Sequence, residues 1–176
     1  LTKVRNELKI TKVTDLGEKG GEESTHIKGA LNEGGIRIVV GDSRQGWVDA
    51  YQELINYAFD PQVRARLNKD ERDYLKVIID LSQIRPAGQK LKGFGGTSNP
   101  VKLGQMVRKV AALLTTARGR RLTPVEACLV IDEAAACIVA GNIRRSAGMR
   151  QFSFGNEQAA NAKDGLYTQD KEGNWK

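Results

Sequence analysis

A glycine-rich segment, KLKGFGGTSNP (90–100), carries the side chains best suited to bind an anion. Lys90 and Lys92 lead into a glycine cluster, and Pro100 then opens an amphipathic run. Backbone N–H groups at the start of a helix, with lysines beside them, can hold a phosphate group. The segment lacks the Gly-Lys-Ser/Thr of a Walker loop, and Ser98 stands where a dinucleotide fingerprint needs its third glycine. A phosphate-binding loop and a glycine turn packed against a sheet therefore both stay open as interpretations.

The charge pattern around this segment favours phosphate-bearing partners. The chain has 28 basic and 21 acidic residues, and no Asp or Glu occurs in residues 81–125 or 134–156. Such fields attract the phosphates of a nucleotide or of a nucleic acid. A basic nucleic-acid-binding module is therefore an alternative function. Against it, Phe94 is the single aromatic residue in 81–125, and single-strand binders usually offer several stacking platforms.

The sequence offers no catalytic or metal-binding constellation. Cys128 and Cys137 are nine positions apart in one expected helix, which places them on opposite faces and about 13 Å apart along the axis. That separation excludes a disulfide or a shared metal ion, and we expect both cysteines in the core. His26 is the one histidine, and Asp132-Glu133 fits the polar face of a helix. We therefore predict no catalytic residue and no metal ligand.

Strand and helix patterns alternate along the chain, which predicts an α/β fold. Strands are expected over 36–40 (IRIVV) and 77–84 (VIIDLSQI). Asp42 or Ser43 is suited to cap the helix that follows the first strand, and Pro61 ends that helix. A short exposed helix is expected within 62–75.

The glycine segment leads into a second long helix. Ser98 or Asn99 is suited to cap it, and Pro100 at its first position is a standard start signal. Its apolar stripe consists of Leu103, Met106, Val107, Val110, Ala111 and Leu114.

The C-terminal part begins with a capping box, Thr123-Pro124-Val125-Glu126. The helix that it opens is apolar nearly all round, which predicts burial, and Gly141-Asn142 suits its C-terminal cap. Residues 147–154 alternate like a strand, and 155–176 are polar. Residues 1–35 predict turns with short, weak strands or a linker. We therefore divide the chain into a polar linker or short-strand insertion, 1–35, and a second region, 36–176.

Three segments together resemble one family: GDSRQGWVDA (41–50), DLSQIRPAGQKLKGFGGTSNP (80–100) and AGNIRRSAGM (140–149). In order and separation they resemble adenosylcobalamin-dependent ribonucleotide reductases, nearest the monomeric ribonucleoside-triphosphate reductase type. The resemblance implies that this chain is an internal fragment of a longer enzyme. It also implies that 36–176 is part of the family's catalytic α/β barrel, with basic glycine-rich loops forming an allosteric nucleotide site.

The resemblance implies a specificity site for a deoxynucleoside triphosphate effector. The acidic residue at the start of the first helix would meet the deoxyribose, and the glycine segment, as a first specificity loop, would take the phosphates and base. The implied effector-binding residues are Asp42, Ser43, Arg85, Lys90, Lys92, Gly95, Gly96 and Thr97. A second specificity loop with substrate contact is implied at Gly141, Asn142, Arg144, Arg145 and Ser146, with Arg144 as the messenger to the substrate.

The resemblance also implies what the complete enzyme needs. The parent would reduce ribonucleotides with adenosylcobalamin and a thioredoxin-like protein or a dithiol as reductant. The family's radical cysteine, its asparagine and glutamate partners and its redox cysteine pair match nothing in this sequence, so we expect the chain alone to be inactive. The cobalamin contacts are expected in the remaining reductase segments. The charged N-terminus, LTKVRNELKI, shows no signal peptide and no apolar run could span a membrane, so we expect a cytoplasmic protein.

Overall fold

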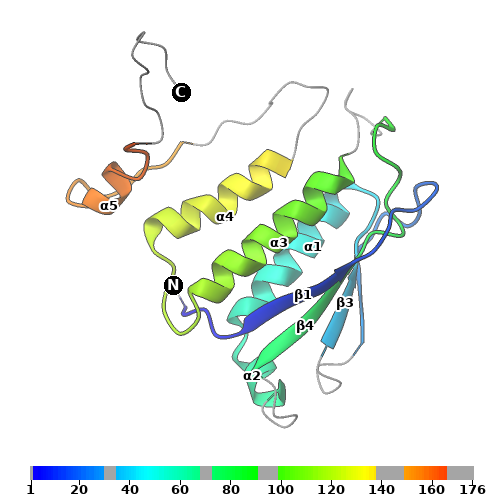
Figure 1. The fold of residues 1–176 in the computed structure, drawn as a ribbon, viewed down its shortest axis with the longest axis horizontal. Coiled ribbons are helices and arrows are strands. Elements are labelled where there is room, and N and C mark those ends of the chain that lie inside the picture. Colours follow the sequence, from blue (N-terminus) through cyan, green and yellow to red (C-terminus); the bar gives the residue numbers. More distant parts are fainter. Residues whose placement is uncertain (1, 30–34, 68–72, 91–98, 138–148, 166–176) are drawn as a thin grey trace.

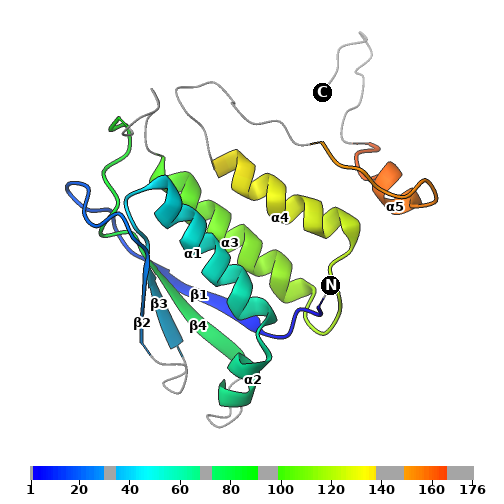
Figure 2. The same ribbon diagram turned by 180° about the vertical axis from the view of Figure 1, so that it is seen from behind.

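The computed structural model describes residues 2–29, 35–67, 73–90, 99–137 and 149–165. Within them, four strands form one sheet, and the helices α1 (Arg44–Phe59) and α3 (Pro100–Thr116) cover one of its faces (Figure 1). Seen from behind, α4 (Pro124–Cys137) packs against α3 on the side away from the sheet (Figure 2). The predicted α/β class is confirmed, with the core between the sheet and its helices.

The sheet is mixed, and its strand order is β1-β4-β3-β2. Its strands are β1 (Glu7–Val13), β2 (His26–Lys28), β3 (Gly35–Val39) and β4 (Tyr74–Asp80). β4 is parallel to both β1 and β3, whereas β2 is antiparallel to β3. The side chains of Ile38, Leu75 and Val77 are fully buried. Burial of such apolar side chains against α1 and α3 explains why these segments form the central strands.

Both strands expected from the sequence are confirmed, although the second one has shifted boundaries. β3 begins and ends within one residue of the predicted range, whereas β4 covers residues 74–80 instead of 77–84. A turn ends β4, because the Ile84 N–H donates to the Leu81 carbonyl at 2.9 Å and the Ser82 N–H donates to the Asp80 carboxylate at 3.0 Å. Aspartate and serine favour such local turns over a strand ladder.

The first 35 residues form both edges of the sheet. β1 is seven residues long and pairs with β4, and β2 adds three residues beside β3. Leu8 and Val4, which precedes β1, belong to the buried core. The sequence predicted only short, weak strands here, because lysines and threonines interrupt the apolar residues of β1. Such a composition is typical of an edge strand with one solvent-facing side.

The predicted start of the first long helix is confirmed at Ser43. Its hydroxyl accepts a hydrogen bond from the Gly46 N–H at 2.9 Å, which makes Ser43, and not Asp42, the cap of α1. α1 ends at Phe59, and Pro61 begins a short second helix, α2 (Pro61–Leu67). Pro61 thus ends one helix and starts the next, as its fixed φ and missing N–H permit.

The second long helix, α3, follows the sequence prediction closely. Asn99 is its cap and accepts from the Lys102 N–H at 3.2 Å, and Pro100 occupies the first turn. Its predicted apolar stripe is confirmed as buried: Leu103, Met106, Val107, Val110, Ala111 and Leu114. Through this stripe α3 packs against β1, and α3 also contacts α4.

The capping box of α4 is confirmed, but the predicted burial of this helix is wrong. The Glu126 N–H donates to the Thr123 hydroxyl at 3.2 Å, and the Thr123 N–H donates to the Glu126 carboxylate at 2.8 Å. Of the helix residues, Val130 and Cys137 are buried, whereas Leu129 and Ile131 are 46% and 54% exposed. The reason is position: α4 is the outermost layer, so one side packs on α3 and the other faces outward (Figure 2).

The C-terminal strand expected over 147–154 is not found in its described part. Residues 149–153 have no regular secondary structure, and the side chains of Met149, Phe152 and Phe154 are exposed. An alternating pattern forms a strand only where a partner strand lies beside it, and the sheet edges lie elsewhere. The polar remainder begins with a short surface helix, α5 (Glu157–Ala160). The predicted helix end at Gly141-Asn142 lies outside the described residues.

Candidate functional site

The candidate site lies at the edge of the sheet where the parallel strands β3 and β4 end. The start of α1 follows β3, and the segment that leads to the glycine loop follows β4 (Figure 1). In open α/β sheets, ligands bind in the crevice outside the carboxyl ends of the strands. The fold therefore brings two predicted effector-binding segments to the edge where a ligand is expected.

Asp42 and Arg85 form a buried ion pair at this edge. The Arg85 Nη2 lies 2.8 Å from Asp42 Oδ2, and its Nε lies 3.1 and 3.0 Å from the two carboxylate oxygens. The Arg85 backbone N–H also donates to Oδ1 at 3.3 Å. The side chains are only 7% and 13% exposed, and the hydrogen bonds to Asp42 raise the pKa of Arg85 further above its ordinary value. The pair ties the loop after β3 to the loop after β4.

A strap of residues 17–24 closes over this ion pair. The Asp42 N–H donates to the Glu22 carbonyl at 2.7 Å, the Gly21 N–H donates to the Gln83 carbonyl at 2.8 Å, and the Ser43 hydroxyl donates to the Glu23 carbonyl at 2.6 Å. Gly20 lies so close to the pair that a Cβ there would overlap Asp42 Oδ2. The strap shields both charges from water, which strengthens their attraction.

Arg85 also fixes the start of the predicted phosphate loop. Its Nη1 donates to the Lys90 carbonyl at 2.8 Å, while the Lys90 side chain is exposed. The structure thus brings together Asp42, Ser43, Arg85 and the backbone of Lys90, four of the predicted site residues. The other predicted residues, Lys92, Gly95, Gly96, Thr97, Gly141, Asn142, Arg144, Arg145 and Ser146, lie outside the described residues.

A second buried carboxylate, Asp80, lies at the end of β4 and was not singled out from the sequence. It accepts from the Thr14 hydroxyl and from Arg37 Nη1, both at 3.1 Å, and from the Ser82 N–H. Burial disfavours its charge, but the hydrogen bonds from Ser82, Arg37 and Thr14 outweigh that penalty and lower its pKa. Two of its donors, Thr14 and Arg37, come from distant segments of the chain, so no local sequence pattern marks its full set of partners. Asp80 positions the strand ends instead of presenting a free charge.

A hollow of about 450 Å³ lies beside the same edge, between the end of β1 and the first two turns of α3. Pro100, Val101 and Gly104 line it from the helix, and Val13, Thr14 and Asp15 line it from the chain after β1. Arg108 supplies a cation and the start of α3 supplies partial positive charge.

The described residues include two cysteines and no cluster of potential metal ligands. Cys128 and Cys137 are free thiols, and no group of three or more potential metal ligands gathers in the described part of the chain. Burial raises the pKa of Cys137 to about 11, which suits a core residue, as predicted, while Cys128 is half-buried. No helix among the residues described could cross a membrane.

A family model matches residues 11–114 of the chain. Its description is "B12-dependent ribonucleotide reductase, insertion domain". The matched range begins within the segment 1–35 and ends in α3, so it contains Asp42, Arg85 and the glycine segment.

Curated relatives and a solved structure agree with this match. The adenosylcobalamin-dependent ribonucleoside-triphosphate reductase of Lactobacillus leichmannii is 43% identical over 107 residues, which are 60% of this chain and 14% of that protein. The protein of the same name from Lactobacillus helveticus is 32% identical over 98% of this chain and 23% of its own length. A crystal structure of a B12-dependent (class II) ribonucleotide reductase matches 97% of this chain and 22% of that chain, with a TM-score of 0.68 and 28% identity. The chain therefore spans less than a quarter of the length of these three proteins.

Proposed function

Because the chain belongs to the insertion-domain family of B12-dependent ribonucleotide reductases, we propose that it supplies the specificity site for a deoxynucleoside triphosphate effector in a larger reductase. The observation that carries the proposal is the Asp42–Arg85 pair, which joins the start of α1 to the start of the glycine segment. Two loops held together at the carboxyl ends of parallel strands form a ready frame for a nucleotide.

Within this proposal, Arg85 orients Asp42 toward the effector. The backbone N–H, Nε and Nη2 of Arg85 together make four contacts with the Asp42 carboxylate, which fills its about four lone-pair sites. A deoxyribose hydroxyl would therefore replace one of these contacts, and the strap of residues 17–24 would move aside to admit it. The phosphates would then be bound by Lys90, Lys92 and the backbone of Gly95, Gly96 and Thr97, with Arg85 and Ser43 holding the two loops in place.

The second specificity loop would report the identity of the effector to the substrate. Gly141, Asn142, Arg144, Arg145 and Ser146 follow α4, and glycine allows such a loop to change its conformation. A loop that touches two ligands transmits information only if its conformations differ in energy between them. Typical coupling free energies of about 1–3 kcal/mol would change substrate preference by roughly 5- to 150-fold. In this proposal Arg144 makes the contact to the ribonucleotide.

The parent enzyme would be a ribonucleoside-triphosphate reductase that uses adenosylcobalamin and a thioredoxin-like or dithiol reductant. Residues 36–176 would form the part of its α/β barrel that carries the specificity region, and 1–35 would add the sheet edges. Neither the hollow of about 450 Å³ nor the hollow of about 280 Å³ is large enough to enclose a corrin ring. We therefore place cobalamin binding in other segments of the parent and expect this chain alone to be inactive.

Calorimetric titration of the chain with the four deoxynucleoside triphosphates tests the effector site. Lys92→Gln removes one of the proposed phosphate cations and leaves Asp42 and Arg85 in the sequence, and Lys163→Gln, on an exposed turn after α5, makes the same charge change elsewhere. We expect Lys92→Gln to weaken binding about fivefold to tenfold at low salt and less at high salt. Equal affinity of Lys92→Gln and wild type would place the site elsewhere.

A further inference from the structure

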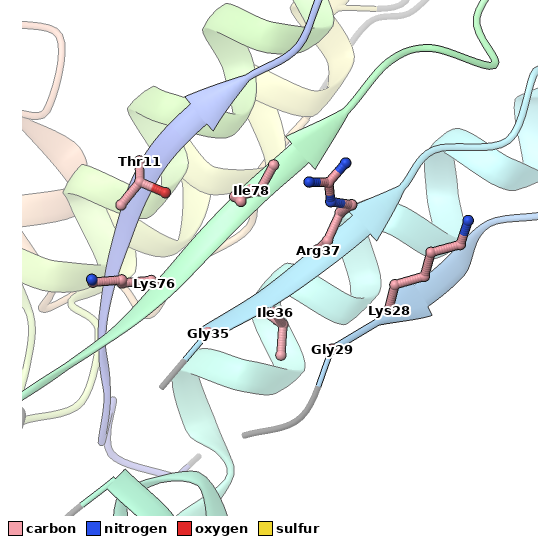
Figure 3. Close-up of a pocket in the computed structure, with 8 residues that line it drawn as sticks. All are labelled: Thr11, Lys28, Gly29, Gly35, Ile36, Arg37, Lys76 and Ile78. Atoms are coloured by element: carbon pink, nitrogen blue, oxygen red, sulfur yellow. The ribbon is translucent and has the colours of Figure 1, made fainter. Parts of the chain in front are cut away.

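The face of the sheet that α1 and α3 leave uncovered carries a row of cations. Lys9 on β1, Lys76 on β4, Arg37 on β3 and Lys28 on β2 are exposed there, one on each strand. Figure 3 views this face, with the helices behind the sheet, and shows Lys76, Arg37 and Lys28 on three neighbouring strands. We call these four residues the cation row.

The register of the strands places these cations directly opposite one another. Lys9 is the partner of Lys76 across β1 and β4, and Lys28 is the partner of Arg37 across β2 and β3. Like charges directly opposite on neighbouring strands destabilise a sheet. Each of the two like-charged pairs therefore lowers the stability of the sheet. An anion bound between the pairs would remove this repulsion.

Few groups in the described part of the chain neutralise the cation row. Arg37 Nη1 lies 3.1 Å from Asp80 Oδ2, and the ammonium of Lys9 lies 4.9 Å from the centre of the Tyr74 ring. Lys28 and Lys76 have no ion pair with any described residue, and both are exposed. Two full positive charges therefore remain available to a ligand.

A hollow of about 280 Å³ lies between the two cation pairs. Lys28, Arg37 and Lys76 line it, together with the hydroxyl-bearing Thr11 and the glycines Gly29 and Gly35 (Figure 3). Gly35 has no side chain to fill the hollow. A Cβ at this position would lie only 3.3 Å from the Cβ of Lys76. A concave site lined by three cations suits a small, highly charged anion better than a flat partner surface.

We propose that this hollow binds the phosphate chain of a polyphosphate, either free or as part of a nucleotide. An arginine fork with lysine point charges on both sides is the arrangement that proteins use for phosphate groups. A triphosphate carries several negative charges, which matches the cation row. Tyr74 is the only described aromatic residue beside the row, and Lys9 already covers its ring, so stacking of nucleic-acid bases contributes little. The site is separate from the Asp42–Arg85 edge and does not rest on the proposed effector site.

Thermal unfolding and calorimetry with sodium tripolyphosphate test the site in the 176-residue chain. Lys76→Gln removes one member of a repulsive pair, so we expect it to raise the melting temperature of the free protein. The same variant should weaken tripolyphosphate binding about fivefold to tenfold at low salt and lose most of the ligand-induced rise in melting temperature. Lys28→Gln should behave alike, and Lys163→Gln should bind as tightly as the wild type. If Lys76→Gln keeps the wild-type affinity, or if Lys163→Gln loses as much, the proposal is wrong.

Two further ligands identify the source of the phosphate. ATP that binds more tightly than tripolyphosphate through Lys76 would indicate a nucleotide, and the reverse order would indicate a free polyphosphate; both support the site. A dT oligonucleotide that binds more tightly than either, through the same lysines, would show a nucleic-acid surface and overturn the proposal. Lys92→Gln separates this site from the effector site, since it should weaken deoxynucleotide binding while leaving the stabilisation that depends on Lys76 intact.

Discussion

The guanidinium of Arg85 forms an ion pair with the carboxylate of Asp42, with 2.8 Å between Nη2 and Oδ2, although 43 positions separate the two residues in the sequence. Both side chains are almost fully buried, and the strap of residues 17–24 covers them. The pair joins the ends of two neighbouring parallel strands, where the proposed effector site lies. Its integrity therefore sets both the stability of this edge and the position of the loops around it.

Breaking the pair should be costly, because it leaves an uncompensated charge in a buried site. We expect Arg85→Ala to lower the free energy of unfolding by about 3 kcal/mol, and the exposed Arg121→Ala to change it by less than about 0.5 kcal/mol. In a double-mutant cycle with Asp42→Asn, the two changes should be strongly non-additive. Urea denaturation of the four proteins measures this, and additive effects would show that the pair contributes no coupling.

Gly20 should tolerate no side chain, although it lies in the exposed strap. The atom that a methyl group would meet is Asp42 Oδ2, and Arg85 prevents that carboxylate from moving aside. We expect Gly20→Ala to destabilise the protein by about 1–3 kcal/mol, as overpacking does. Gly155→Ala is the matched control, because a Cβ at Gly155 meets no atom within 4 Å. Equal melting temperatures of the two variants would mean that the strap does not lie against the pair.

Local signals in the sequence predicted the helices better than the sheet. Ser43, Asn99 and the Thr123–Glu126 box act within a few residues of one another, so their roles can be read directly from spacing. The strand β1 forms by pairing with β4, about 67 residues away. Its lysines interrupt the apolar residues in the sequence, so the pattern of a half-buried strand is hard to recognise. The exposure of Leu129 on α4 likewise depends on which layer covers the helix, which composition alone does not reveal.

The capping box of α4 predicts a pH dependence of stability. The hydrogen bonds from Arg120, together with those involving Thr123 and against the opposing effect of burial, lower the pKa of Glu126 from its ordinary 4.5 to about 2. Because the folded-state pKa is depressed, the stabilisation is present above about pH 4.5 and is lost as the pH falls toward about 2. Glu126→Gln should therefore show a smaller loss of stability in that window than the wild type, by urea denaturation at several pH values.

Glu157→Gln, which removes the same charge from the first turn of α5, serves as its control. This variant should keep the steep decline of the wild type between about pH 4.5 and 2. A Glu126→Gln protein with the same decline as wild type would contradict the role assigned to the Glu126 carboxylate and its ion pair with Arg120.

The two cysteines should differ sharply in reactivity. Burial raises the pKa of Cys137 from its ordinary 9.0 to about 11, which reduces its thiolate fraction at neutral pH about 100-fold. We expect iodoacetamide to alkylate the half-buried Cys128 in the folded protein and to reach Cys137 only in denaturant. Peptide mass spectrometry after timed labelling measures both rates. Comparable labelling of the two thiols in the folded state would contradict the packing of the last turn of α4.

The candidate site could be predicted from the sequence only as separate segments. The resemblance of 41–50 and 80–100 to a reductase family pointed to both loops, but not to the contact between Asp42 and Arg85. That contact arises because β3 and β4 are neighbours, and sheet order is not encoded in any short motif. Asp80 escaped notice for the same reason, since Thr14 and Arg37 reach it from distant parts of the chain.

Photo-crosslinking with an azido derivative of dATP tests the central claim most directly, because it locates the nucleotide on the chain. The proposed specificity site predicts labelled peptides within residues 85–99 or 141–147, and labelling there should fall when unlabelled dATP is added. Lys92→Gln should reduce this labelling, and Lys163→Gln should not. Labelling confined to the strands β1 to β4, or labelling that unlabelled dATP does not reduce, would contradict the account.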